Sequence, residues 1–389
     1  MEKVLKKIKI ICIIVMVICV SVFTAWKMIP VDAKLELIKS LSKREIVRNI
    51  VAEEVQSDYE KNILDAEFDD QDIAVGEQIR QKLSGFKNVV LFGIDARDSS
   101  FDNATRSDTI MIISINNETG AIRIVSLYRD TFLKIIGKDG DTYYSKVNAA
   151  YSEGGAKSAL STLNTNLDLN ISDYVVVNFY GLSEIIDMLG GIEIMISDLE
   201  MSRINKISTD MIEGTDIEYV PLEESGEVHL DGLQATAFCR IRDAEFYDES
   251  GNKYEYDFGR TARQRYVMQK LVSKAKGSGI STLLSLVKQI MNMNTEEEIF
   301  LKTSLDYNEI MDLVPVLVDY NIERSTGFPF TLATPNIDGT DLVVAQGLTY
   351  NVSELHRFLF DDEEYQPSDS VRKTDDYIKT YTKIPEKHK

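Results

Sequence analysis

Cysteine and histidine are scarce in this chain of 389 residues, and their scarcity excludes several kinds of chemistry. Two of the three cysteines, Cys12 and Cys19, lie in one apolar N-terminal run, which leaves Cys239 alone in the rest of the chain. An intrachain disulfide framework and a thiolate metal site are therefore excluded. The three histidines lie far apart in sequence, so zinc hydrolysis and a Ser-His-Asp triad have little support: His229, His356 and His388.

Positive charge is also in short supply. The chain has 43 lysines and arginines against 63 aspartates and glutamates, which gives a formal net charge of -20 at pH 7. Such a balance opposes a nucleic-acid footprint spread over the whole surface. Any anion-binding site must therefore come from a local group of arginines. The hydrophobic content of 44% is typical of a well-packed globular core.

The long apolar run lies at the N-terminus. Residues 10–26 contain no charged side chain, and the run has about the shortest length that can cross a bilayer. Lysines precede it, so the positive-inside rule predicts a cytoplasmic end (1–9), a transmembrane anchor (10–26) and the rest of the chain outside the cell membrane. A cleaved signal peptide is the alternative, because residues 31–33 read as a cleavage pattern. We favour a retained anchor, because Trp26 is typical of a membrane interface.

The remaining chain divides by composition into three parts. Residues 27–85 are rich in charged side chains and predict a helical extracytoplasmic spacer. Strand and helix patterns alternate through residues 86–361, which predicts an α/β domain with a central mixed β-sheet flanked by helices. Residues 362–389 are charged and contain prolines, so we expect a disordered tail.

A β-hairpin is predicted within residues 109–130, where two apolar runs flank the turn residues 117–120. If the turn centres between Glu118 and Thr119, Asp108 lies opposite Arg129 to within a residue or two. The segments RSD and YRD are then neighbours at one end of the sheet.

A second group of arginines follows in residues 240–265. In the segment CRIR, strand alternation would place Arg240 and Arg242 on the same face. The acidic stretch 243–256 is interpreted as a loop over the site. The sequence therefore predicts that Arg240 and Arg242 are followed directly by an acidic loop.

A helix is predicted from about Gly259, with Arg260, Arg263 and Gln264 on the stripe that later meets the core. Arg265 falls on the opposite side and is predicted to be a surface charge. Inward arginines at a helix N-terminus suit a phosphate group, which accepts bidentate hydrogen bonds from guanidinium. The alternative is an internal salt-bridge network, because buried charges need partners. Its acids would be Asp95, Asp98, Asp108, Asp130 and Asp257.

Eight short motifs occur in order between residues 86 and 276: NVVLFGIDARD, TRSDTIMIISIN, IVSLYRDT, KVNAAYSEGG, DYVVVNFYGL, IDMLGGIEI, HLDGLQATAFCRIR and DFGRTARQR. In this order they resemble the LytR-CpsA-Psr family of membrane-anchored cell-wall enzymes. The resemblance implies a phosphotransferase that moves a polyprenyl-pyrophosphate-linked glycopolymer, such as a teichoic acid or capsule, onto peptidoglycan. Polyprenyl phosphate is released, and the cofactor implied is Mg²⁺.

The resemblance also implies roles for individual residues. Asp95 and Asp108 match positions that would hold Mg²⁺, and either of them, or Asp130, would accept the hydroxyl proton. Arg97 is a second-rank candidate beside them, as is Asp130. The residues expected to bind the pyrophosphate are Arg106, Arg129, Arg240, Arg242, Arg260 and Gln264, with Arg129 also counted in the catalytic group.

Two departures from the family pattern leave the polymer and the acceptor open. Leu127-Tyr128 stands where the family commonly has Ile-Pro, and Tyr256 stands where it often has glycine. Two alternative functions use the same arginines: a module that binds the glycopolymer without ligase activity, and a pyrophosphatase with water as acceptor. A transcriptional regulator is disfavoured by the net charge and the outward topology.

Overall fold

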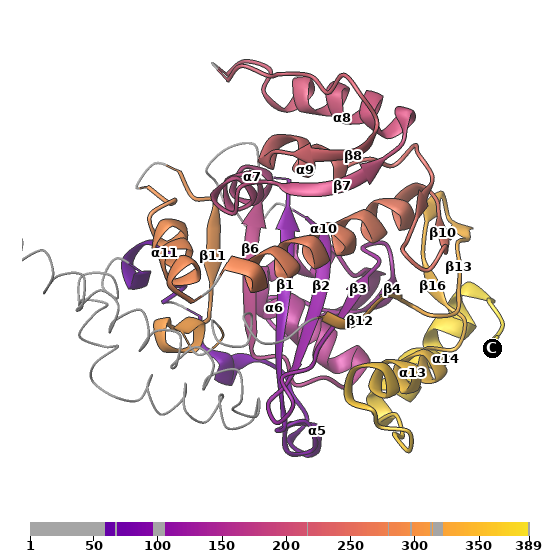
Figure 1. The fold of residues 1–389 in the computed structure, drawn as a ribbon. Helices are drawn as coiled ribbons and strands as arrows, with labels where there is room; N and C mark the ends of the chain where they lie inside the picture. Colours follow the sequence, from indigo (N-terminus) through magenta and orange to yellow (C-terminus); the bar gives the residue numbers. More distant parts are fainter. Residues whose placement is uncertain are drawn as a thin grey trace, which may run out of the picture. The chain divides into compact units, whose positions relative to one another are not determined.

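The apolar strands in the first half of the chain build the central sheet of this computed structural model, which describes residues 59–66, 68–95, 106–215, 217–278, 280–295, 298–311, 313 and 322–387. The sheet has six strands in the order β11-β6-β1-β2-β3-β12 (Figure 1). β1 pairs antiparallel with β2 and parallel with β6, which confirms the predicted mixed sheet. The strands span Phe86–Ile94 (β1), Ser107–Asn116 (β2), Ile122–Leu127 (β3), Asp173–Asn178 (β6), Leu301–Thr303 (β11) and Ile322–Phe328 (β12).

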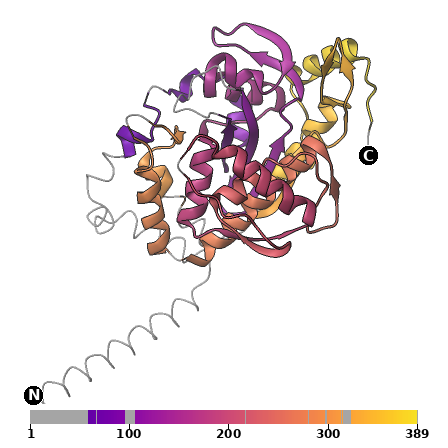
Figure 2. The ribbon, with the colours of Figure 1, turned by 90° about the horizontal axis from the view of Figure 1, so that it is seen from above.

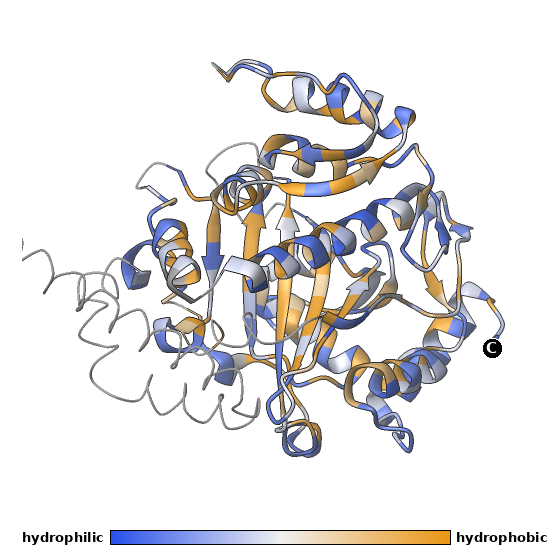
Figure 3. Cartoon of the chain, viewed as in Figure 1, coloured by the Kyte–Doolittle hydropathy of each residue, from blue (hydrophilic) through white to orange (hydrophobic). Residues whose placement is uncertain are grey.

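Helices cover both faces of the sheet because its central strands are apolar on both sides (Figure 3). On one face, Ile110 and Ile112 of β2 join a core with Leu160 of α6 (Ala149–Leu167). On the other face, Met111 packs with Met268 of α10 (Tyr256–Ser278). The alternation of side chains along a strand therefore places one helix on each face.

A second layer stands at the end of the sheet where β1 and β6 finish. It contains α7 (Phe179–Met188), β7 (Ile192–Ile196), α8 (Asp198–Met211), β8 (Gly226–Leu230) and α9 (Gly232–Phe238). These elements share a core with α10, with Ile186, Ile194 and Phe238 fully or almost fully buried. α10 thus contacts both the sheet and this layer, so residues on its first turns lie between the two.

The remaining elements are short or lie toward the C-terminus: η1 (Asp70–Asp72), α5 (Glu77–Lys82), β4 (Phe132–Ile136), β5 (Thr142–Lys146), β9 (Phe246–Tyr247), β10 (Lys253–Tyr254), α11 (Ile280–Met291), β13 (Leu332–Ala333), β14 (Asn336–Ile337), β15 (Thr340–Asp341), β16 (Val344–Ala345), α13 (Leu348–Phe360) and α14 (Asp369–Thr382). Figures 1 and 2 place α11 and the C-terminal helices α13 and α14 at opposite ends of the sheet.

The hairpin of β2 and β3 has the predicted register, with Ile112 opposite Val125 and Met111 opposite Ser126. Its turn is fixed by the side chain of Asn116, which accepts hydrogen bonds from the backbone N–H groups of Glu118 and Thr119. The prediction that residues 108 and 129 come together at one end of the sheet follows from this register.

The strand, helix and strand predicted after residue 173 are β6, α7 and β7, with Gly190 and Gly191 ending the helix at positive φ. β7 does not join the central sheet, however, and pairs with β8 in a separate ribbon. A Cβ at Gly191 would lie 2.5 Å from the Nε2 atom of His229, so the chain passes too close to β8 for a larger residue.

The predicted spacer is part of the domain where the structure describes it. Tyr59 and Ile63 are buried, and the Tyr59 hydroxyl donates to the carbonyl of Leu305. The predicted anchor, residues 10–26, lies outside the described residues. Within the part of the chain that is described, no helix is long and apolar enough to cross a membrane.

The expectation of a disordered tail is wrong for α14. Val371 and Ile378 of this helix are buried in the main core, and Ser368 caps its N-terminus. The segment is charged in composition but amphipathic as a helix, because its buried residues recur at helical spacing while its charged side chains other than Asp375 lie toward solvent.

Candidate functional site

Two aspartates mark the end of neighbouring strands in the central sheet. Asp95 follows β1 directly, and Asp108 is the second residue of β2. The register between β1 and β2 shifts here, with Gly93 opposite Thr109 and Ile94 opposite Ser107, so Asp108 is the extra residue of a bulge. Bulges re-aim side chains at the end of a ladder. Both carboxylates line the same cavity.

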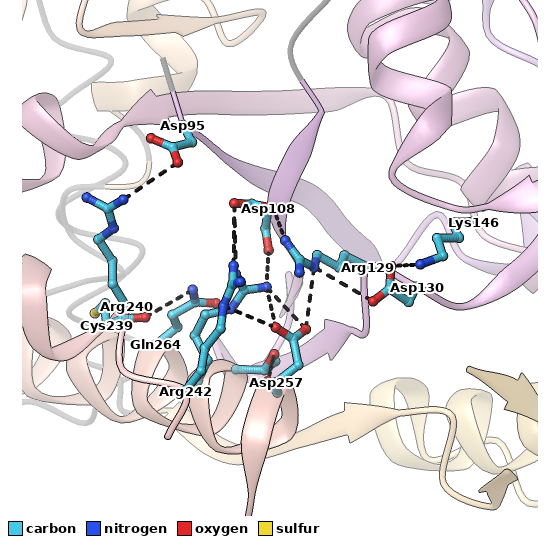
Figure 4. A network of polar contacts seen from close by, with 12 residues as sticks. Asp95, Asp108, Arg129, Asp130, Lys146, Cys239, Arg240, Arg242, Asp257 and Gln264 are labelled. Carbon is cyan, nitrogen blue, oxygen red and sulfur yellow. Dashed lines mark hydrogen bonds and ion pairs between the residues drawn. The ribbon is translucent and has the colours of Figure 1, made fainter. Parts of the chain in front are cut away.

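Arg129 follows β3 by two residues and forms an ion pair with Asp108, as the hairpin register predicts (Figure 4). Its Nε atom also lies 3.6 Å from Asp257 and 3.9 Å from Asp130. Burial opposes the charge of Arg129, but Asp257 and Asp108 outweigh it and raise the pKa of the guanidinium. Arg129 is therefore held at the centre of a charged network.

Arg240 and Arg242 reach the same cavity from a turn, which corrects the predicted strand. The preceding residues form α9, because Asp231 caps its N-terminus in a capping box. The chain then turns so that Ile241 is fully buried and the two arginines flank it on the outer side. Arg240 lies 3.6 Å from Asp95, and its guanidinium stacks 4.3 Å from the ring of Phe179.

Arg242 is half exposed and contacts two acids at longer range, Asp257 at 3.7 Å and Asp108 at 4.0 Å. It thus shares both partners with Arg129. The predicted convergence of Arg240 and Arg242 on one side is confirmed, although the backbone that achieves it differs from the prediction.

Helix α10 begins at Tyr256 and brings Asp257 and Arg260 to the site from its first turn. Arg260 is 3% exposed; its Nη2 atom lies 2.9 Å from the Asp257 carboxylate and donates to the backbone carbonyl of Asp108 at 3.2 Å. Burial is the main cause that lowers the pKa of Arg260 to about 10, and the like charges of Arg129 and Arg242 add to it. The two neighbouring arginines therefore add to the cost of keeping this buried guanidinium charged.

The other arginines of α10 do not reach the cavity. Arg263 is fully buried, which confirms its place on the inward stripe, and its guanidinium binds Glu200 of α8. Arg265 is 4% exposed, which contradicts its interpretation as a surface charge. It is covered because part of the predicted loop 243–256 is a hairpin, β9 and β10, whose Tyr254 ring lies 5.8 Å from the Arg265 guanidinium.

The cavity has a volume of about 640 Å³, and charged or polar side chains form most of its wall. Gln264 lines it and donates to the carbonyl of Cys239 at 3.4 Å. The Nε atoms of Arg129 and Arg260 are buried and have no hydrogen-bond acceptor within the described ranges. Its lining residues from the strand ends and arginine-bearing segments are Asp95, Asp108, Arg240, Arg242, Arg260 and Gln264.

The opposite wall comes from the second layer. Phe179 and Tyr180 begin α7, while Ile207, Asp210 and Met211 belong to the last turns of α8. A smaller apolar cavity of about 50 Å³ adjoins the first and shares Phe179 and Gln264 with it. It lies between the sheet and α10, where its lining includes Leu91, Met111, Val177, Leu182, Met268 and Leu271.

Four predicted residues lie apart from the lining of this cavity or cannot be placed. Arg129 does not line the cavity itself, although it pairs with Asp108, which does. Asp130 faces Lys146, whose Nζ atom lies 2.9 Å from its carboxylate, and it does not line the cavity. Arg106 is exposed just before β2, and no ion pair to it is found within the described ranges. Arg97 lies outside the described residues.

The sequence analysis did not predict the full part that two residues, Asp257 and Lys146, take in the charged network. Asp257 was considered only as a neutralising acid, yet it contacts Arg129, Arg242 and Arg260. Its position three residues before Arg260 on the same helix was the available signal. Lys146 gave no such signal, because its place beside Asp130 depends on the pairing of β4 with β5.

Comparison with known proteins gives a family and a fold. Polyisoprenyl-teichoic acid--peptidoglycan teichoic acid transferase TagU of Bacillus cereus (strain AH820) is 31% identical over 231 residues, which are 58% of this chain. The match spans 66% of that relative's length, slightly less than two thirds. The structure of a transcriptional regulator (EF0465) from Enterococcus faecalis has a TM-score of 0.53 and 26% identity, covering 81% of this chain and all of that one.

A structure of TagT bound to LIIa-WTA shares the fold at a TM-score of 0.52 and 22% identity, covering 71% of this chain and 91% of that one. The model of the LytR_cpsA_psr family matches residues 49–346, well over half of the chain. The resemblance seen in the motifs is thereby confirmed, and the protein belongs to the LytR_cpsA_psr family.

Proposed function

We propose that this protein is a phosphotransferase that moves a polyprenyl-pyrophosphate-linked glycopolymer onto peptidoglycan and releases polyprenyl phosphate. The observation that carries the proposal is the convergence of Arg240, Arg242 and Arg260, from two separate segments, on one polar cavity, with Arg129 paired to Asp108 in the wall of that cavity. The name of the Bacillus cereus relative, a transferase of teichoic acid to peptidoglycan, supports the polymer class and the acceptor.

The diphosphate would lie among these arginines. Guanidinium groups bind phosphate oxygens in bidentate fashion and stabilise the charge that moves between them during transfer. Arg260, which lines the cavity, would supply a buried Nε donor that has no acceptor among the described residues, and the more exposed Arg242 can adjust to the bound group. The internal ion pairs with Asp108 and Asp257 keep the arginines in place before the substrate arrives.

The polyprenyl chain would enter the apolar cavity beside the arginines. This cavity adjoins the polar one through Phe179 and Gln264, so a diphosphate and the first part of an apolar chain could bind at the same time. Its volume of about 50 Å³ holds only a few carbon atoms, so a longer chain needs helix α10 or α7 to shift.

A magnesium ion fits the acids of the site. The described residues contain no group of three or more potential protein ligands, but Mg²⁺ commonly binds to one or two carboxylates together with waters and substrate phosphates. Asp95 and Asp108 lie at adjacent strand ends and line one cavity, so they would hold the ion. When bound, it would neutralise charge on the diphosphate that the arginines leave uncompensated.

The general base would come from Asp95 or Asp108. Both line the cavity, whereas Asp130 is paired with Lys146 outside the lining. A base must lie within hydrogen-bond reach of the hydroxyl that it deprotonates. We therefore remove Asp130 from the candidates for this role.

The location of the domain remains a proposal based on the sequence. The lysines before residues 10–26 favour a single-pass protein of the cell membrane with residues 1–9 in the cytoplasm and the arginine cavity outside. Polyprenyl-linked polymer and peptidoglycan would meet on that side. A reporter fused after residue 389 that is active only outside the cytoplasm tests this orientation, and activity of a cytoplasmic reporter contradicts it.

The experiment that tests the function uses the full chain with polyprenyl-pyrophosphate-linked glycopolymer and peptidoglycan. The expected result is polymer attached to peptidoglycan together with released polyprenyl phosphate, both lost when the metal is chelated and restored by Mg²⁺. Release of phosphate without attached polymer would indicate a pyrophosphatase. Retention of intact substrate would indicate a binding module.

A further inference from the structure

Arg263 is fully buried on α10 and takes no part in the cavity. It follows Arg260 by three residues but points toward α8. Its Nε and Nη2 atoms donate to one carboxylate oxygen of Glu200 at 3.1 and 2.8 Å. The rings of Phe238 and Phe246 lie 5.5 and 5.2 Å from its guanidinium carbon.

The same guanidinium is bound to the backbone of the turn that presents Arg242. It donates to the carbonyl oxygens of Glu245 at 2.9 Å, Ala244 at 3.2 Å and Ile241 at 3.5 Å. These carbonyls lie in irregular backbone, where no strand or helix supplies a donor. Arg263 therefore holds the turn through three backbone carbonyl oxygens without lining the cavity itself.

Glu200 connects this turn to the far wall of the cavity. One of its carboxylate oxygens binds Arg263, while the other accepts from the backbone N–H and the hydroxyl of Ser197 in the cap of α8. Glu200 lies in the first turn of α8, and the last turns of the same helix line the cavity. A second link lies at the surface, where Arg203 of α8 binds Asp243 of the turn at 2.8 Å.

A buried ion pair of this kind is poorly explained by stability alone. Desolvation cancels much of the attraction between buried charges, and apolar residues of similar volume often stabilise a protein as well or better. An arginine offers something that an apolar side chain cannot, which is several donors in a fixed plane. Within the described ranges, the hydrogen bonds of that plane go to the turn and to Glu200 of α8.

We propose that Arg263 and Glu200 are positioning residues, which fix the turn 239–245 against α8 so that Arg240 and Arg242 point into the diphosphate cavity. The inference rests on the proposed function, because it assumes that the cavity binds a diphosphate. It assigns to neither residue a contact with the substrate.

The test measures binding of inorganic pyrophosphate to the full chain by calorimetry, together with KM and kcat for polymer transfer. Arg263→Lys keeps the charge but loses the planar set of donors. We expect its affinity for pyrophosphate to fall about tenfold and KM to rise by a similar factor, a size typical of coupled neighbouring groups. Glu200→Gln keeps the shape and removes the charge, and it should act in the same direction.

Two comparisons separate positioning from a general loss of structure. In the background of Arg242→Ala, Arg263→Lys should reduce pyrophosphate affinity by less than it does in the wild type, because the part of its effect that acts through Arg242 is already lost and only the part through Arg240 remains. Lys270→Ala is the matched control, since Lys270 lies on the same helix and binds the exposed Glu249. It should leave affinity unchanged. A thermal melt of each variant identifies those that have lost the fold, and Glu200→Gln then takes the place of Arg263→Lys.

Wild-type affinity in Arg263→Lys, or fully additive losses in the double variant, would overturn the positioning role while leaving the proposed function intact. Failure of the wild-type protein to bind pyrophosphate would instead overturn the proposed function and this inference with it.

Discussion

Asp108 and Arg129 form an ion pair at the open end of the β2–β3 hairpin, where the antiparallel strands bring the start of β2 next to the end of β3. The pair places Arg129 next to an acid of the cavity wall, and the buried Nε atom of Arg129 has no hydrogen-bond acceptor within the described ranges. Asp257 from α10 closes the network, since it lies near Arg129, Arg242 and Arg260. Loss of Arg129, Arg260 or Asp257 would therefore leave a partly buried partner without its compensating charge.

Arg129→Ala should cost both activity and stability. The substitution removes the main partner of the partly buried Asp108, and an unsatisfied buried group costs about 1–3 kcal/mol. Transfer should fall by at least about 100-fold, as expected when a donor to a phosphoryl group is lost. Urea unfolding and the transfer assay measure the two effects. Unchanged unfolding with lost transfer would show that the network does not contribute to the fold.

Arg242→Ala should cost activity alone. Its side chain is 50% exposed and its ion pairs are 3.7 and 4.0 Å long, so screening by solvent makes them weak. We expect the unfolding free energy to stay within about 0.5 kcal/mol of the wild type, while transfer falls about 100-fold. The contrast with Arg129→Ala in the same two assays is the control. A stability loss as large as that of Arg129→Ala would contradict the assignment.

The parts of the site that depend on local pattern were predictable. Strand alternation and the turn after Asn116 determined the register that joins Asp108 to Arg129. Helical spacing predicted that Arg260 faces inward. These inferences need only the period of a strand or a helix and one turn.

The parts that depend on distant packing were not predictable. The segment around Ile241 has the alternation of a strand, yet it forms a turn because α9 ends just before it. Arg265 is buried because a short hairpin folds over it, and helical spacing alone carries no information about that cover. The tail was misjudged because its few apolar residues meet a core built mostly from earlier segments.

Asp95 and Asp130 should respond differently to the same substitution. Asp95→Asn removes a carboxylate that lines the cavity, so transfer should fall by about 100- to 10,000-fold, the usual contribution of a general base. Asp130→Asn should retain most activity, because that side chain faces Lys146. Steady-state transfer rates compare the two variants. An equal loss in Asp130→Asn would return Asp130 to the site.

His356 predicts how the stability of the fold depends on pH. The side chain is fully buried and stacks 3.5 Å from the ring of Tyr365, and its Nε2–H donates to the carbonyl of Leu167 at 3.0 Å. Burial lowers the pKa of His356 to about 4. The unfolded chain, with an ordinary histidine pKa near 6.5, therefore binds more protons than the folded chain between about pH 4 and pH 6.5. Stability must fall as the pH is lowered through this window.

The loss from this one group should approach about 3 kcal/mol at the acid end of the window. The measurement is urea unfolding at several pH values between 7 and 4 for the wild type and for His356→Gln, which can still donate to Leu167 but does not titrate. The variant should show a smaller loss of unfolding free energy on acidification. His229→Gln is the matched control for the loss of a histidine, because His229 is 56% exposed whereas His356 is fully buried. Equal slopes in His356→Gln and the wild type would show that this histidine is not buried in its neutral form, because a group with the same pKa in both states contributes no pH dependence.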